Sequence, residues 1–216
     1  MKNFKQNIIF RLLLLLLLLI IFVCFSAYSY ASAVSCNLSN NVLRLHILAN
    51  SDSKEDQTLK LKIRDAILDY MNSLSINLNS KEEAINAINV HIDEFYSIAE
   101  NIISSEGYSY PVDISIEKCD FPTKSYGDVS LPAGIYDALR IKIGSANGHN
   151  WWCVMFPPIC FVDVSSGIVP ESSKSTLKNN LGTEEYQLIS NDSSNYTFKF
   201  KLIELVENIK FNLAQK

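Results

Sequence analysis

The sequence contains none of the short motifs that commonly mark a catalytic or metal-binding site. It has three histidines and seven glycines in 216 residues. There is no HExxH motif, no CxxC pair, no GxSxG nucleophile turn and no glycine-rich phosphate loop after a strand. We therefore expect no catalytic residues, no bound metal and no cofactor.

An excess of positive charge is also missing. The chain carries 19 basic and 23 acidic residues, and three of the basic ones, Lys2, Lys5 and Arg11, lie near the N-terminus. Without that segment, 16 basic and 23 acidic residues remain, a formal charge of −7. Such a charge excludes nucleic acid and an anionic membrane surface as expected partners.

The N-terminus has the features of an export signal. The three positive residues are followed by an apolar run, Leu12–Phe25, and then by Ala31-Ser32-Ala33, which fits a signal-peptidase site. The run is shorter than the ~20 residues of a typical membrane-spanning helix. We predict a signal peptide over residues 1–33, with an uncleaved membrane anchor as the alternative. A short linker over 34–41 and a single domain over 42–216 would follow.

The first half of this domain shows one strand and two helices. Apolar residues alternate with Arg44 and His46 over Val42–Leu48, which predicts a strand. Capping residues at Asp52 and Ser53 begin an amphipathic helix that ends near Leu74, and Ser80 begins a second one that continues to about Ser105.

The second half is richer in strand patterns. Alternation predicts strands over 112–117 and 139–143, and the apolar run Trp151–Phe156 predicts a strand that is central and covered on both faces. The last two strands should form a hairpin, and a helix is favoured over 196–211. We therefore expect an α+β fold, with two long amphipathic helices packed on a mainly antiparallel sheet.

The cysteines leave two interpretations open. Cys153 and Cys160 flank a Pro-Pro turn and are the best candidates for a structural disulfide in an exported protein, but two buried free thiols fit equally well. A cysteine hydrolase would use one of them as nucleophile with His46 or His149 as base, although the apolar surroundings should make the thiols inert. The spacing of His149, Cys153 and Cys160 matches no common zinc site.

Polar residues gather where the first strand meets the first helix and before the Trp-Trp strand. As a hypothesis, they form a partner-binding surface, while the alternative is that they only cap helices and stabilise turns. Trp151 is added because one of two adjacent strand tryptophans can face a partner. The candidate residues are His46, Asn50, Asp52, Asp56, His149, Asn150 and Trp151.

Three stretches carry a specific resemblance: Leu43–Leu68, Phe121–Gly144 and Gly148–Asp163, the last of which reads GHNWWCVMFPPICFVD. Together with the N-terminal signal, they resemble the stage II sporulation protein R family of endospore-forming bacteria. The resemblance implies an intercellular signal rather than an enzyme, and it brings no catalytic residues.

In that family, the forespore exports the protein into the space between its own membrane and that of the mother cell. The resemblance implies that the partner is a membrane-bound aspartic-type protease, which then cleaves the precursor of the early mother-cell sigma factor. The chain itself would meet the membrane only through its export signal or anchor.

Overall fold

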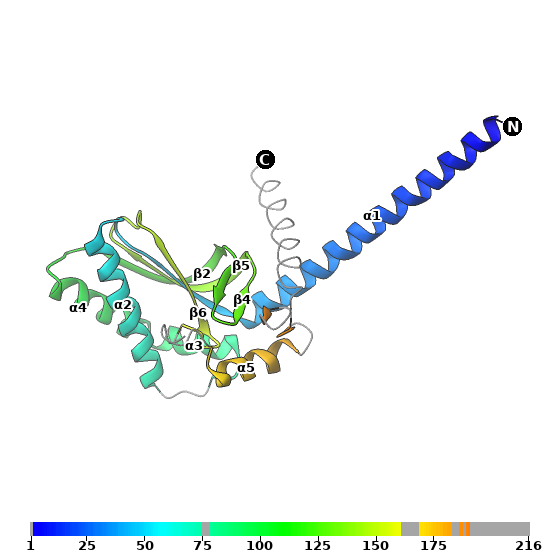
Figure 1. Ribbon diagram of the computed structural model, residues 1–216. Helices are drawn as coiled ribbons and strands as arrows, with labels where there is room; N and C mark the ends of the chain where they lie inside the picture. The colour runs from blue at the N-terminus through cyan, green and yellow to red at the C-terminus, as the bar shows by residue number, and fades with distance from the viewer. Residues whose placement is uncertain (1, 75–77, 161–168, 183–185, 188, 191–216) are drawn as a thin grey trace.

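The computed structural model describes residues 2–74, 78–160, 169–182, 186–187 and 189–190. Five helices and six strands lie within these residues (Figure 1). In chain order they are α1 Lys2–Asn41, β1 Leu43–Leu48, α2 Lys54–Ser73, α3 Lys81–Val90, α4 Ile92–Ser105, β2 Val112–Phe121, β3 Lys124–Tyr126, β4 Val129–Leu131, β5 Gly134–Ile143, β6 Asn150–Phe156 and α5 Glu171–Leu181.

Four strands form one mixed sheet in the order β2-β5-β1-β6. β1 runs parallel to β5 and antiparallel to β6, and β2 is antiparallel to β5. β3 and β4 form a separate two-stranded hairpin. The expected α+β class with a mainly antiparallel sheet is confirmed.

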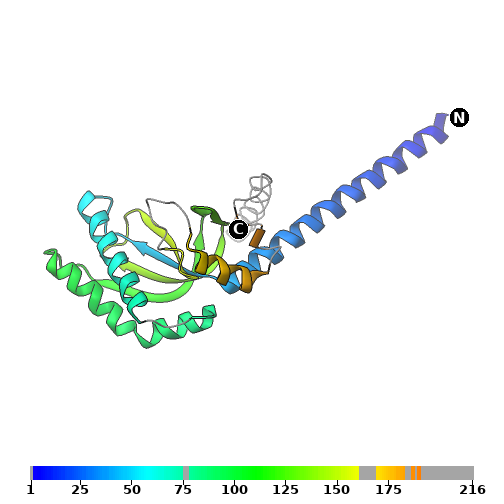
Figure 2. The same ribbon diagram turned by 60° about the horizontal axis from the view of Figure 1, so that its bottom comes forward.

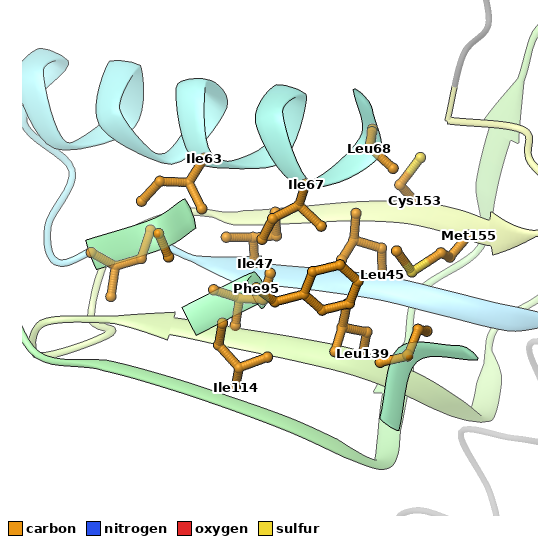
Figure 3. Close-up of a cluster of buried hydrophobic side chains, with 14 of the residues drawn as sticks. Leu45, Ile47, Ile63, Ile67, Leu68, Phe95, Ile114, Leu139, Cys153 and Met155 are labelled. Carbon is orange, nitrogen blue, oxygen red and sulfur yellow. The ribbon is translucent and has the colours of Figure 1, made fainter. Parts of the chain in front are cut away.

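Helices α2, α3 and α4 lie together on one side of this sheet (Figure 2). Alternation along β1 directs Leu45 and Ile47 to that side, where they meet Ile63 and Ile67 of α2 and Phe95 of α4 (Figure 3). All five side chains are fully buried. This apolar layer fixes the position of α2, and therefore of the junction between β1 and α2.

The opposite side of the sheet carries a second core, which includes the end of α1. Val34 and Leu38 are buried there with Ala138 of β5 and Leu177 of α5. The segment 34–41, which we expected as a linker, is therefore helical and packed. Its apolar residues are spaced one helical turn apart, so that both reach the core on one face.

The hairpin expected between residues 139–143 and 150–156 does not form. β1 lies between β5 and β6, so β6 is at the edge of the described sheet rather than at its centre. Strands joined by a short loop usually pair, but here a strand from much earlier in the chain takes the central place. The strand predicted over Trp151–Phe156 is present as β6 and ends directly before Pro157, and the Phe156–Pro157 peptide bond is cis.

The helix expected over 80–105 is divided in two at His91. His91 has φ −108° and ψ 20°, outside the helical range, and its ring Nδ1 is hydrogen-bonded to the Tyr70 hydroxyl of α2 at 2.9 Å. A tertiary contact thus accompanies a break that the continuous apolar stripe did not predict. Farther along the chain, residues Glu171–Leu181 form α5. The helix favoured over 196–211 lies outside the described residues.

Candidate functional site

The junction between β1 and α2 is a rigid turn built around Asn50 and Asp56. The Asn50 side chain donates to Asp56 Oδ2 at 2.9 Å, and its Oδ1 accepts from the Ser145 amide at 2.9 Å. Ser51 donates its hydroxyl proton to the same Asp56 oxygen at 2.5 Å. Burial opposes ionisation of Asp56, but the hydrogen bonds from Ser51 and Asn50 outweigh it and lower the pKa of the carboxyl group. Asn50 therefore joins the start of α2 to the loop between β5 and β6.

Asp52 and His149 join the same two segments at the surface. Asp52 Oδ1 accepts from the His149 backbone amide at 2.5 Å and also contacts ring Nδ1. Beneath them, Lys60 donates to the His149 carbonyl oxygen at 2.8 Å, and burial lowers the pKa of its ammonium group. The side chains of His149 and Asp52 remain 77% and 55% exposed. They are thus held by structure and still available to a partner.

Gly148 is required for this close approach of the two segments. Its amide donates to the Ala49 carbonyl oxygen at 2.9 Å. A Cβ at this position would lie 2.2 Å from the Ser51 carbonyl oxygen, closer than two such atoms can approach. We call the surface formed by Asn50–Ser53 and Gly148–His149 the tip.

His46 and Asn150 lie on the sheet face opposite α2, beside the tip. His46 donates from Nε2 to Asn150 Oδ1 at 2.8 Å, and its ring stacks on Trp152 with 3.8 Å between centroids. Burial lowers the pKa of His46 to about 4, so its imidazole is neutral at physiological pH. Strand pairing places Trp152, His46 and Arg140 side by side across this face. His46 is only 5% exposed, so Asn150 is the accessible member of the pair.

Trp151 lies on the other face of β6, toward α2. The Arg64 guanidinium of α2 sits 4.3 Å from its ring centroid, a cation–π contact. Both residues line a cavity of about 600 Å³ between α2, the β3–β4 hairpin and the turn after β6. The seven candidate residues therefore lie in different places. Asn50, Asp52 and His149 are at the tip, and Asp56 is buried beneath it. His46 and Asn150 are on the sheet face opposite α2, and Trp151 lines this cavity.

Cys153 and Cys160 are joined by a disulfide, with 5.6 Å between their Cα atoms. This decides between the two interpretations of the pair, and it leaves neither sulfur as a thiolate nucleophile or a zinc ligand. In the described part of the chain, no group of three His, Cys, Asp or Glu side chains is placed to hold a metal ion. Cys36 is exposed and Cys119 is buried, both as free thiols.

Arg44 is buried, although the alternating pattern of its strand placed it with His46 on a polar face. Its Nε donates to the Cys153 carbonyl oxygen at 2.9 Å, and Nη2 donates to the Tyr126 hydroxyl at 2.7 Å. The guanidinium lies 4.2 Å from the centroid of the Phe121 ring. Arg44 therefore stabilises β6 and the β3–β4 hairpin and cannot belong to a recognition surface. From the sequence, only the aromatic residues near 121–136 could have indicated that Arg44 is buried.

An apolar N-terminal helix followed by an α+β domain with a disulfide fits an exported protein domain. α1 is the one helix, among the described residues, that is long and apolar enough to cross a membrane. The family model described as Stage II sporulation protein R matches residues 39–166, so the chain belongs to that family.

A curated relative supports this assignment. Stage II sporulation protein R of Bacillus subtilis (strain 168) is 42% identical over 130 residues, which are 60% of this chain and 58% of the relative. The chain thus matches a little over half the length of that relative. No solved structure matches the chain.

Proposed function

We propose that this protein is an exported signalling protein of endospore formation. It leaves the forespore and activates a membrane-bound aspartic-type protease in the neighbouring mother-cell membrane. The protease then processes the precursor of the early mother-cell sigma factor. The observation that carries the proposal is membership of the stage II sporulation protein R family over residues 39–166, which contain the whole described sheet and helices α2, α3 and α4.

The arrangement of the domain supports a docking role for the tip. α1 leads into β1 at one end of the sheet, and the tip lies at the other end of β1 (Figure 1). A domain anchored through α1 therefore presents the tip away from its own membrane. The hydrogen bonds that join Asn50, Asp52 and His149 hold the exposed groups in one geometry, which reduces the entropy lost on binding.

Activation by docking requires a difference in affinity between two states of the protease. If the tip binds the competent state more tightly by about 3 kcal/mol, the ratio of the two states changes by more than a hundredfold. Asp52, His149 and Asn150 supply exposed polar groups for such a contact. Asn50 and Asp56 position them, and His46 holds the Asn150 amide.

Co-expression tests this function. The protease, the sigma-factor precursor and the full chain are produced together, and precursor cleavage is measured with and without the chain. Asp52→Lys should reduce cleavage by about tenfold or more, because charge reversal at an interface costs over 1.4 kcal/mol. Glu100→Lys, on the exposed face of α4, changes the net charge equally and should leave cleavage unchanged.

The two parts of the proposal fail separately. If the precursor is cleaved equally without the chain, activation of the protease is refuted. If cleavage depends on the chain but the folded Asp52→Lys variant acts like the wild type, the function stands and the tip is the wrong surface.

A further inference from the structure

The cavity beside Trp151 lies outside the tip and has the size of a binding site. Its volume is about 600 Å³, within the range of roughly 300–1,000 Å³ that is common for ligand pockets. The buried residues that line it, Leu68, Cys153 and Ile159, are all apolar, and Figure 3 shows Leu68 of α2 beside Cys153 of β6. The charged residues that line it are partly or fully exposed, so an apolar floor opens to solvent at a polar mouth.

Contacts around the cavity hold its walls in place. The Tyr126 hydroxyl accepts from Arg44 at 2.7 Å and donates to the Trp152 carbonyl oxygen at 3.2 Å, which fixes the β3–β4 hairpin against β6. On the opposite wall, the Arg64 guanidinium packs on the Trp151 ring. The cavity is therefore preformed, and an occupant would not have to order its walls, which lowers the entropy lost on binding.

The mouth of the cavity carries more negative than positive charge. Arg64, Asp65 and Asp69 are its charged lining residues, and Arg64 is already paired with Asp65 through Nε at 2.7 Å and Nη2 at 2.6 Å. Asp69 is exposed and has no hydrogen bond or ion pair within the described residues. It follows Asp65 by one turn of α2, where like charges repel. A cation at the mouth would relieve this repulsion.

The wall formed by Trp151 also contains an unpaired donor. Its Nε1 atom is shielded from solvent, and no hydrogen-bond acceptor reaches it in the part of the chain that the structure describes. A buried N–H group without an acceptor is unfavourable, so a carbonyl oxygen brought by an occupant would be stabilised there. A peptide supplies such oxygens along its backbone, whereas a free metal ion or amine supplies none.

We propose that this cavity docks an extended loop or terminus of a partner protein, in which an apolar side chain lies beside a lysine or arginine. The apolar side chain packs against Leu68 and Ile159, as an anchor does at the centre of an interface. The basic group lies at the mouth beside Asp69, and a backbone carbonyl accepts from Trp151 Nε1. The partner is the protease of the proposed function, and this assignment of the partner rests on that function.

Binding of short peptides to the full chain tests the site without the protease. The chain is prepared in a non-ionic detergent with isotope-labelled tryptophan, so that its two tryptophans give two indole N–H signals, which Trp151→Phe assigns. The probes are acetylated, amidated pentapeptides Gly-Lys-X-Lys-Gly, in which X is Leu, Ile, Phe or Tyr. At least one should shift the Trp151 signal downfield and saturably, while the Trp152 signal, from the other face of β6, moves less. Matched peptides with glutamate in place of lysine should bind at least about tenfold more weakly.

A charge reversal at the mouth tests the role of Asp69. Asp69→Lys should weaken binding of the lysine peptides by about tenfold or more, because like charges then face each other. The variant should fold, because it places a lysine four residues after Asp65 on α2, which is a favourable helix pair. Glu100→Lys, on the exposed face of α4, changes the net charge equally and should leave binding within about twofold. In the co-expression assay, Asp69→Lys should likewise reduce precursor cleavage.

Each part of the inference can fail on its own. If no lysine peptide shifts the Trp151 signal, or if the glutamate peptides bind equally well, the docking site is overturned. If the lysine peptides bind but the folded Asp69→Lys variant supports full precursor cleavage, the protease is not the partner at this cavity. If the precursor is cleaved equally without the chain, the proposed function fails, and the peptide titration still decides whether the cavity binds such a segment.

Discussion

Reduction of the Cys153–Cys160 disulfide should destabilise the domain by a predictable amount. The two cysteines are seven residues apart in sequence. For a loop of this size, the chain-entropy relation gives about 2.4 kcal/mol at 25 °C, because reduction restores conformational freedom to the unfolded chain. For a domain of this length, that corresponds to a decrease in melting temperature of about 5–10 °C.

Thermal unfolding followed by circular dichroism, with and without a reductant, measures this decrease. The double variant Cys153→Ala, Cys160→Ala should melt at about the temperature of the reduced wild type and should not respond to reductant. Cys36 and Cys119 are free thiols in both proteins, so any effect of the reductant on them is the same in each.

The same variant separates docking from thiol chemistry. Below its melting temperature, it should still activate the protease in the co-expression assay, because the disulfide only constrains the turn after β6. Loss of activation in the folded variant would favour a catalytic sulfur. A melting temperature that is unchanged after verified reduction would refute the stability argument.

Three further outcomes follow from buried groups and close contacts. Burial lowers the pKa of His46 from 6.5 to about 4, so protonation of its ring favours the unfolded state. The free energy of unfolding should therefore fall by about 2–3 kcal/mol as the pH drops from 6.5 to 4. His46→Gln should remove that part of the pH dependence in urea titrations. Gly148→Ala places a Cβ against the Ser51 carbonyl and should cost about 2 kcal/mol in the same assay, whereas Gly134→Ala, with its nearest contact at 3.4 Å, should be nearly neutral. Lys81 is buried at the start of α3 and donates to the Ser39 carbonyl oxygen and to the Asp137 carboxylate. Lys81→Met removes this donor from both partly buried acceptors and should cost about 1–3 kcal/mol.

Features that depend on neighbouring residues could be predicted from the sequence. The alternation over 42–48 gave β1, and the capping residues gave the start of α2, where the Asp56 amide donates to the Ser53 hydroxyl at 3.1 Å. The Pro-Pro turn marked Cys153 and Cys160 as the best candidates for a disulfide, but the sequence left two free thiols as an equal alternative, and the structure decides for the disulfide. These features depend on residues that are near one another in sequence.

Features that depend on distant contacts were not predicted. The loop between residues 143 and 150 suggested a hairpin because nothing nearby indicates that β1 takes the place between the two strands. The apolar stripe continues across His91, where the helix breaks beside Tyr70. Among the candidate residues, sequence alone could not separate Trp151, which faces α2, from Asn150, which lies beside the tip.

The central position of β1 has a consequence for how the chain reaches its native state. β1 is the first of the described strands along the chain, but Leu45 pairs with Leu139 on one side and Cys153 on the other. A chain delivered from its N-terminus must therefore keep this apolar strand unpaired until most of its length has emerged. Closing loops of that size slows folding. A polypeptide that folds late is still unfolded while it crosses a membrane.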